Sequence, residues 1–447
     1  MNWPQLLSAD RLGSDRPTVL DPLRSPFVVD SDRVVFSSAF RRLQDKTQVF
    51  PLADNDYVRT RLTHSLEVAS VARSLGARVG AEIVQRHGLA PDFHASDFGA
   101  IVSAAALAHD LGNPPFGHSG EDAIRHWFKT SPVAAETRGE LSEDEHADFA
   151  CFEGNAQGFR IVTRLQMPDN PGLRLTCAAL GAFTKYPRTA LLRGPTSGIS
   201  AKKFGFFNAE GSFFVKVAEA TGLIPRGEGV TWWCRHPLAF LVEAADDICY
   251  RLVDFEDGYR LKFLSFEEVS EAFLAVTGDL KDRERAARNA DPKDQIAFLR
   301  AQAIGVSIRQ VADAFLANEP AMLAGEFDEE LLGLDIPARD PLDHIKRRSR
   351  ATIYATQRGV EIEAAGYEVL GGLLDIFHGA ADDVARNGPK AARKSEKLLS
   401  LVPAQFLAPE GSPYERLLRM TDFVSGMTDS YAVSLYKKVR GISLPGQ

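Results

Sequence analysis

The amino-acid sequence predicts an all-α protein with at most a short β-hairpin. Apolar residues recur at three- and four-residue steps over long stretches, which is the pattern of amphipathic helices. Alternating strand patterns are scarce: only 204–207 and 213–217 are candidates for short extended pieces, and no repeated βαβ unit is present. The chain of 447 residues is 45% hydrophobic and 25% charged, which provides enough apolar content for a sizeable core.

Helices are predicted from apolar stripes and end signals along the chain. A first helix carries one continuous apolar face: Leu62, Leu66, Ala69, Ala72, Leu75 and Val79. A second helix is expected to start at Ser96, a suitable N-cap, and to stop at Gly112. A third begins with Pro237 at its first position. Its buried stripe is Leu238, Leu241, Val242, Ala245, Ile248 and Leu252.

The remaining stretches show weaker patterns. Near the C-terminus, 362–377 and 414–435 are also predicted to be helical. A charged segment at 278–294 is expected to separate a core from a C-terminal helical region. Three stretches lack a clear period and are predicted to be irregular: residues 1–30, 129–149 and 187–212.

Composition argues against several classes of protein. With 52 basic and 60 acidic residues the formal net charge is -8, so the chain is a poor candidate for coating duplex nucleic acid. The four cysteines form no CxxC pair, which argues against a disulfide framework or a cysteine zinc site and fits a reducing compartment. The first residues lack a signal-peptide pattern, and the longest apolar stretch, 98–108, is too short to cross a bilayer. We therefore expect a cytoplasmic protein with no membrane partner.

Histidines and carboxylates on three predicted helices suggest a metal site. His64 begins one helix, His109 and Asp110 end another, and Asp246-Asp247 lie midway along a third, apolar helix. Buried carboxylates need a cation or strong hydrogen bonds, and a mixed His/Asp set suits a divalent ion such as Mn, Fe, Co, Ni or Zn, with Mg as another option. Such a set leaves positions for water and a phosphate oxygen.

Each of these residues also has a purely structural interpretation. Chance alone gives about one His-acid pair in this composition. His64 can be a hydrogen bonder at a helix start, and Asp247 can simply pair with Arg251 one turn later. The occurrence of the residues on three separate helices favours the metal site.

Five motifs then carry a resemblance to a known family: RTRLTHS, AHDLGNPPFGHSGE, FEGNAQ, FTKYPR and EAADDICYR. In this order they resemble the deoxyguanosine triphosphate triphosphohydrolase family of HD-domain proteins, over roughly Val34 to Arg260, with some likeness at 341–372. The resemblance implies an HD-domain helical core with additional C-terminal helices. Three regions are expected: an N-terminal arm at 1–30, a metal-dependent phosphohydrolase core at 31–265, and a C-terminal helical region at 266–447 that packs on the core.

The resemblance also implies roles for individual residues. The metal quartet maps onto His64, His109, Asp110 and one of the two neighbouring aspartates. We choose Asp246, because helical spacing places Tyr250, matching the family's deoxyribose-packing tyrosine, on the same face. His118 and Glu121 match the catalytic histidine and its acidic partner, and they are three residues apart, so they can meet on one face of a helix.

Substrate contacts are carried over in the same way. Gln48 resembles a glutamine that bonds the deoxyribose 3′-OH. The implied polyphosphate contacts are Arg61, Lys185, Tyr186 and Lys203, and Asn155 is a phosphate or subunit contact. The basic cluster of Lys346, Arg347, Arg348 and Arg350 could close over phosphates, bind single-stranded nucleic acid or be a solvated helix face. Core packing is the favoured interpretation of Phe204, Phe206 and Phe207.

The implied activity is hydrolysis of deoxynucleoside triphosphates, with dGTP favoured, to deoxynucleoside and inorganic triphosphate. Water attacks the α-phosphorus, and His118 protonates the leaving 5′ oxygen directly or through water. Alternatives are another HD-type nucleotide phosphohydrolase or phosphodiesterase, or a regulator that binds nucleotide or single-stranded nucleic acid. The resemblance further implies a homo-oligomer, hexamer or tetramer, and a nucleotide effector or single-stranded DNA as additional partners.

Overall fold

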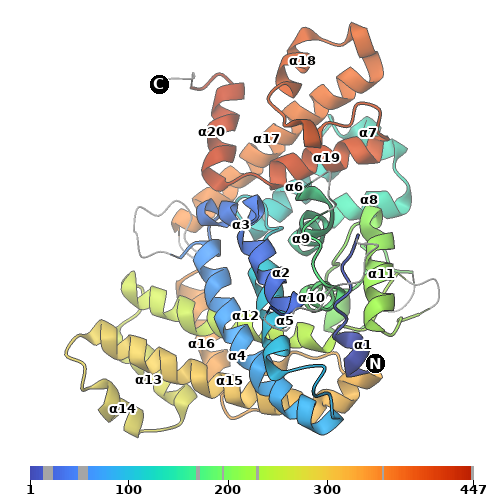
Figure 1. Cartoon of the computed structure of the whole chain (residues 1–447). Helices are drawn as coiled ribbons and strands as arrows, with labels where there is room; N and C mark the ends of the chain where they lie inside the picture. The colour runs from blue at the N-terminus through green and yellow to red at the C-terminus, as the bar shows by residue number, and fades with distance from the viewer. Residues whose placement is uncertain are drawn as a thin grey trace.

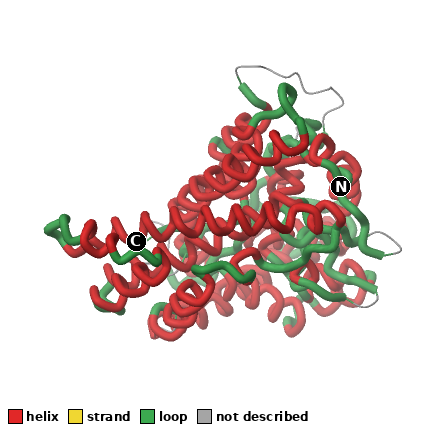
Figure 2. The backbone as a smooth tube through the Cα atoms, turned by 90° about the horizontal axis from the view of Figure 1, so that it is seen from below, coloured by secondary structure: helices red, strands yellow, loops and turns green. Residues whose placement is uncertain are grey.

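The computed structural model describes residues 1–13, 24–48, 59–167, 172–193, 196–227, 231–354 and 357–443. These residues form helices joined by loops (Figure 2), and pairing between extended residues is limited to isolated β-bridges such as Arg188 with Trp232. The prediction of an all-α protein is therefore confirmed. Residues 14–23 of the predicted N-terminal arm lie outside the described residues.

The α-helices are numbered in chain order as in Figure 1. They are α1 (Trp3–Leu6), α2 (Pro26–Val35), α3 (Ser38–Arg42), α4 (Arg61–His87), α5 (Ala95–Ala108), α6 (His118–Thr130), α7 (Ala135–Glu140), α8 (Glu143–Ala150), α9 (Gly154–Arg160), α10 (Cys177–Phe183), α11 (Gly211–Thr221), α12 (Pro237–Arg260), α13 (Phe266–Thr277), α14 (Lys281–Ala286), α15 (Pro292–Ala324), α16 (Arg339–Thr352), α17 (Gln357–Asn387), α18 (Arg393–Leu399), α19 (Pro413–Ser425) and α20 (Asp429–Val439). Short helical turns lie between them: η1 (Leu43–Asp45), η2 (Ile161–Leu165), η3 (Ile199–Ala201), η4 (Asn208–Glu210), η5 (Leu331–Gly333), η6 (Gly388–Lys390) and η7 (Ala404–Phe406).

Helices α4 and α5 pack against each other near the middle of the molecule (Figure 1). Their close approach depends on glycine, because a Cβ atom at Gly76 would lie only 2.7 Å from the backbone oxygen of Phe98. A Cβ atom at Gly80 would meet the side chain of Phe98 at 2.8 Å. His64 lies in the first turn of α4 and His109 follows α5, so this contact fixes how closely the two histidine-bearing helices pack.

Two details of these helices correct the predictions. Ser96 is not the N-cap of α5: the helix starts one residue earlier, and the Asp97 carboxylate accepts the backbone N–H of His94 at 2.9 Å. An acid in the first turn therefore caps the helix instead of the serine. Leu66 is exposed, because it does not lie on the buried face of α4. That face is formed by Val68, Ala72, Leu75, Val79 and Ile83.

Neither candidate strand forms. Residues 213–217 lie inside α11, and residues 204–207 are a buried loop between η3 and η4. Phe206 stacks on Phe214 with ring centroids 4.5 Å apart and an angle of 11° between the planes. The aromatic residues that suggested β-structure instead fill the core, which confirms the core interpretation of Phe204, Phe206 and Phe207.

Two other segments differ from the predictions: residues 129–149 are more helical than predicted, and the helix predicted at 414–435 is interrupted. Residues 129–149 contain α7 and most of α8, which Ser142 starts with a reciprocal capping box to Glu145. Glu136 of α7 and residues 143–145 of α8 lie in the first turns of these helices, where their charge is favourable, rather than in an irregular stretch. The predicted helix at 414–435 is two helices, because a turn intervenes and the Thr428 side chain caps α20.

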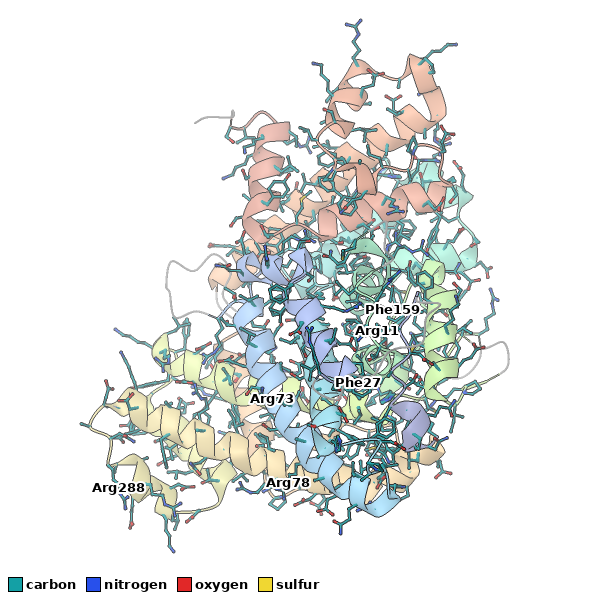
Figure 3. The ribbon with its side chains drawn as sticks, in the orientation of Figure 1. Arg11, Phe27, Arg73, Arg78, Phe159 and Arg288 are labelled. Atoms are coloured by element: carbon teal, nitrogen blue, oxygen red, sulfur yellow. The ribbon has the colours of Figure 1, made fainter. Side chains whose placement is uncertain are left out.

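The apolar interior is divided into two clusters that do not follow chain order. The first joins α1 to α5 with α10 to α13, α15 and α16, and the second joins α6 and α8 with α17, α19 and α20. Figure 3 shows Phe27 and Phe159 of the first cluster among the central helices, while Arg288 lies at the exposed end that carries α14. The division at residues 30 and 265 stays a prediction. No helix in the described part of the chain has the length and apolar character needed to cross a membrane.

Asp148 is a buried carboxyl group that makes stability depend on pH. Its Oδ2 accepts the hydroxyl of Tyr414 at 2.6 Å and the N–H of Asn208 at 2.8 Å, and burial raises its pKa to about 8. The folded protein therefore keeps a proton that the unfolded chain releases above pH 4. The free energy of unfolding should consequently decrease by about 1 kcal/mol per pH unit between pH 5 and 8 on account of this group.

The variant Asp148→Asn should show a flatter pH dependence than the wild-type protein. Urea unfolding at pH 5, 6, 7 and 8 measures the difference, with Glu143→Gln on the exposed face of the same helix as the control. Parallel pH profiles for wild type and Asp148→Asn would show that Asp148 is ionised in the folded state.

Candidate active site

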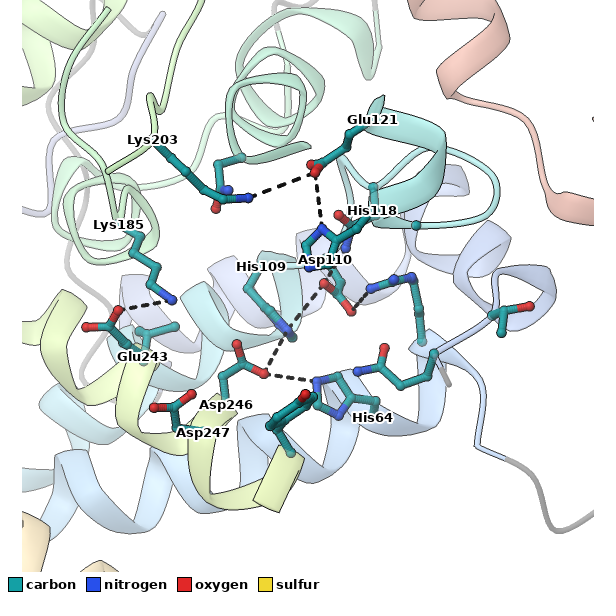
Figure 4. Close-up of a pocket in the computed structure, with 18 of the residues that line it drawn as sticks. His64, His109, Asp110, His118, Glu121, Lys185, Lys203, Glu243, Asp246 and Asp247 are labelled. Atoms are coloured by element: carbon teal, nitrogen blue, oxygen red, sulfur yellow. Dashed lines mark hydrogen bonds and ion pairs between the residues drawn. The ribbon is translucent and has the colours of Figure 1, made fainter. Parts of the chain in front are cut away.

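One cavity of about 610 Å³ contains the whole predicted site (Figure 4). Every residue that the sequence assigned to metal, catalysis or substrate lines it: Gln48, Arg61, His64, His109, Asp110, His118, Glu121, Asn155, Lys185, Tyr186, Lys203, Asp246 and Tyr250. These residues come from distant parts of the chain, and the fold brings all of them together. Their individual roles stay predictions.

His64, His109 and Asp246 form the centre of the cavity. They project from the first turn of α4, the end of α5 and the middle of α12, and one ligand atom from each lies within 4.8 Å of the others. His64 Nε2 lies 3.1 Å and His109 Nε2 lies 3.7 Å from the same oxygen of Asp246. Two imidazoles and a carboxylate converging in this way are a donor set for a divalent metal ion.

The hydrogen bonding of His109 supports this interpretation. Its Nδ1 lies 2.6 Å from the backbone oxygen of Ala106, which assigns the ring proton to Nδ1. Its Nε2 is buried, and no hydrogen-bond partner for it is found among the described residues. A buried unpaired nitrogen is costly, whereas a metal-binding histidine characteristically donates its other N–H to a carbonyl. The residues present therefore fit a metal ion.

Asp110 occupies a different position from the other three predicted ligands. Its Oδ1 is 3.5 Å from His109 Nε2, but the carboxylate is also held by Arg61 at 2.9 Å and by the amide of Asn113. Burial raises the pKa of Asp110, yet the charges of Arg61 and the two histidines outweigh it and lower the pKa to about 2. The group is thus an anion at neutral pH, as a ligand must be.

The two neighbouring aspartates of α12 have opposite electrostatic environments. Burial opposes ionisation of Asp246, but the hydrogen bond from His64 and the charge of His109 hold its pKa well below the usual range. Burial raises the pKa of Asp247 to about 6. Asp247 lies 3.6 Å from Arg251, the pairing that helical spacing predicted. Asp246 is therefore the aspartate of the pair that faces the histidines, and its role as a metal ligand stays a prediction.

His118 and Glu121 form a second unit at the start of α6. The His118 ring is 80% exposed to the cavity, and its Nδ1 lies 3.1 Å from Oε2 of Glu121. Glu121 is buried, and its Oε1 accepts the backbone N–H of Gly154 at 2.6 Å. Burial opposes ionisation of Glu121, but the bond to His118 and the charge of Lys203 lower its pKa. An ionised Glu121 therefore orients an imidazole whose Nε2 faces the cavity.

Comparisons with known proteins agree with this geometry. The HD domain model matches residues 61–153, which include His64, His109 and the His118–Glu121 pair but not Asp246. The chain is 47% identical to a deoxyguanosinetriphosphate triphosphohydrolase-like protein of Synechocystis sp., over 99% of this chain and 100% of that protein. It is 31% identical to a deoxyguanosinetriphosphate triphosphohydrolase of Klebsiella pneumoniae, over 99% and 98%. The chain belongs to the deoxyguanosinetriphosphate triphosphohydrolase family of HD-domain proteins.

The cations that the family resemblance assigned to phosphate are already paired with carboxylates. Lys185 lies 3.1 Å from Glu243, and Lys203 lies 2.9 Å from Glu153. Burial opposes the charge of Lys203, but Glu121 and Glu153 raise its pKa. Both lysines are therefore neutralised by protein carboxylates, and their contact with phosphate stays a prediction.

The sequence prediction missed several residues of the cavity. Glu243 lines the cavity, and Glu153 pairs with the cavity residue Lys203. Both lie within motifs that carry the resemblance, so their positions were a usable signal. Tyr354 was not foreseeable: its ring stacks on Tyr250 with centroids 5.3 Å apart, and its hydroxyl bonds Asp254 at 2.6 Å. No motif marks this long-range contact.

The basic cluster on α16 is divided between two environments. Lys346 and Arg350 line the cavity of this family member, one turn apart on the face of α16 that meets α12. Arg348 instead pairs with Glu268 of α13. Arg347 is exposed, so the four residues do not share one environment, and phosphate binding by this cluster stays a prediction.

Proposed function

We propose that the protein hydrolyses deoxynucleoside triphosphates, with dGTP favoured, to the deoxynucleoside and inorganic triphosphate. The observation that carries the proposal is the unpaired, buried Nε2 of His109 beside Asp246 and His64, in the same cavity as the His118–Glu121 pair. The names of the relatives support the same reaction. The paired lysines on the cavity wall support a highly charged substrate.

His64, His109 and Asp246 would hold a divalent ion, Mn, Mg, Co, Fe, Ni or Zn, with Asp110 as the predicted fourth ligand. Such an ion supplies Lewis acidity, which makes a water molecule more nucleophilic and offsets charge on the α-phosphate oxygens. The protein contributes the fixed geometry. The carboxylate of Asp110 accepts hydrogen bonds from Arg61 and Asn113, so its orientation does not depend on the ion.

His118 is suited to the leaving group. Glu121 accepts a hydrogen bond from the Nδ1–H of His118 at 3.1 Å, which fixes the orientation of the ring. The Nε2 proton is then available to the 5′ oxygen as the bond to the α-phosphorus breaks. The exposure of the ring to the cavity permits this contact, and the backbone hydrogen bond from Gly154 keeps Glu121 in place.

Two features of the cavity suit a deoxyribose. The side-chain oxygen of Gln48 is buried, and no hydrogen-bond partner for it is found in the described part of the chain, so it can accept a sugar hydroxyl. Tyr250 is fixed by its stack on Tyr354, and a rigid ring against the sugar leaves little room for a 2′-OH. The base preference, a hexameric or tetrameric assembly, a nucleotide effector and a cytoplasmic location remain part of the proposal.

A product assay tests the proposal. Purified protein with Mn is given each of the four dNTPs separately, with GTP as the ribose control, and the released phosphate species are separated. Tripolyphosphate and deoxynucleoside are expected, with dGTP turned over fastest; mixtures of dNTPs are tested if no single one reacts. Release of phosphate, pyrophosphate or a monophosphate would favour another HD-type phosphohydrolase. Binding without turnover under all conditions would favour a regulator.

A further inference from the structure

The turn that precedes α20 meets two segments of the cavity wall. Asp429, the first residue of α20, is 1% exposed, and its carboxylate accepts three hydrogen bonds. Its Oδ2 accepts the N–H of Thr47 at 3.0 Å and the hydroxyl of Thr47 at 2.7 Å, and its Oδ1 accepts the N–H of Phe116 at 3.0 Å. One carboxylate thus joins two segments that lie 69 residues apart in the chain.

A buried lysine joins the same three segments. The ammonium group of Lys46 donates to the backbone oxygen of Asn113 and, at 3.1 Å, to that of Ser425 at the end of α19. At the surface, the Ser430 hydroxyl donates to Asp45 at 2.9 Å. Residues at the end of α19 and the start of α20 are therefore joined by hydrogen bonds to residues 45–47 and 113–116. None of these bonds involves the three candidate metal ligands.

The segment that receives these bonds has a strained backbone. Phe116 and Gly117 have φ angles of +64° and +61°, and a phenylalanine is unfavourable in this left-handed region. Strain of this kind persists only where surrounding contacts hold it. The bond from the Phe116 N–H to Asp429 is such a contact, and His118 follows two residues later.

We infer that Asp429 is a positioning residue that sets the placement of His118 relative to Gln48. Gln48 follows Thr47 directly, and His118 has an exposed ring that depends on its backbone for its position. Asp429 touches neither the cavity nor the substrate. It acts through two backbone N–H groups and one hydroxyl, so the C-terminal helices are part of the catalytic geometry. The expected change in kcat rests on the proposed function, whereas the expected change in hydrogen exchange does not.

The test compares Asp429→Ala with a matched variant, Asp375→Ala. Asp375 on α17 likewise accepts two uncharged donors, Trp127 Nε1 at 2.7 Å and the Ser131 hydroxyl at 2.6 Å, away from the cavity. For Asp429→Ala we expect kcat for dGTP to fall roughly 10- to 100-fold, the cost of a displacement of about 1 Å in a reacting group. Affinity for Mn should be unchanged, and Asp375→Ala should keep the wild-type kcat.

Hydrogen exchange gives a measure that does not depend on activity. Peptides containing Thr47 and Phe116 should exchange faster in Asp429→Ala and not in Asp375→Ala. Unchanged protection, protection lost without a fall in kcat, or an equal fall in both variants would overturn the inference. Wild-type protein that releases no tripolyphosphate would refute the proposed function, and the exchange data would still test the bonds of Asp429.

A second pair of variants keeps the test valid if Asp429→Ala does not fold. Thr47→Val removes the hydroxyl bond to Asp429 but keeps the backbone N–H, and Thr47→Ser keeps both donors. Thr47→Val should lower kcat severalfold and speed exchange of the 46–48 amides, while Thr47→Ser should behave as wild type. Equal kcat and equal exchange in the two variants would overturn the inference.

Discussion

Replacement of His109 by alanine is expected to abolish metal binding and turnover together. The change removes the buried Nε2, for which no hydrogen-bond partner is found among the described residues, and it leaves His64 and Asp246 as the only members of the three-residue group. Metal affinity depends on ligand number and geometry, so two remaining donors form a poor site for an ion. Calorimetric titration with Mn and the tripolyphosphate assay should both show no signal above background.

The control is His94→Ala. His94 lies at the other end of α5 and is exposed, and its interactions there belong to the N-terminal cap of the helix, far along the chain from His109. This variant should bind Mn and turn over substrate as wild type does. Measurable Mn binding or full activity in His109→Ala would remove His109 from the ligand set.

Replacement of His118 by alanine is expected to separate chemistry from metal binding. The rate should fall by roughly two to four orders of magnitude, the usual loss when a general acid is removed. Mn affinity should stay at the wild-type value, because His118 lies outside the group of His64, His109 and Asp246. Single-turnover product release and Mn titration on the same preparation measure the two effects.

His126→Ala is the matched variant for this experiment. His126 is on the same helix, is exposed, and packs its ring at 5.8 Å from Tyr367 rather than toward the cavity. Its activity should equal that of wild type. If His118→Ala keeps full activity, the proton must come from another group, and if it loses Mn, His118 is a ligand instead.

The site was predictable where local spacing decides the geometry. The distance of one helical turn places Asp246 beside Tyr250 and Asp247 beside Arg251, and the three-residue step brings His118 to Glu121. These relations depend only on helix geometry. The amphipathic stripes were sufficient for the all-α class for the same reason.

Other features depend on contacts between distant segments, and local pattern says little about them. The Phe-rich stretch at 204–207 has the composition of a strand, but tertiary packing against Phe214 decides its conformation. The stack of Tyr354 on Tyr250 and the bonds of Asp429 to residues 47 and 116 join segments that are far apart in the sequence, so local spacing does not relate them. The motif that contains Glu243 marks the residue as a candidate for the site, but its pairing with Lys185 depends on how α12 packs beside residue 185.

The glycine contact between α4 and α5 has a consequence for how this centre can change. With no side chain at Gly76, the two backbones touch, and neither helix can move closer without overlap. A larger residue there would wedge the helices apart and widen the gap between two of the candidate ligands. The contact therefore sets a lower limit on the distance between the two helices that carry the histidines. Closely packed helices do not change their separation gradually. Adaptation to an ion of another size must therefore come through replacement of the donor side chains.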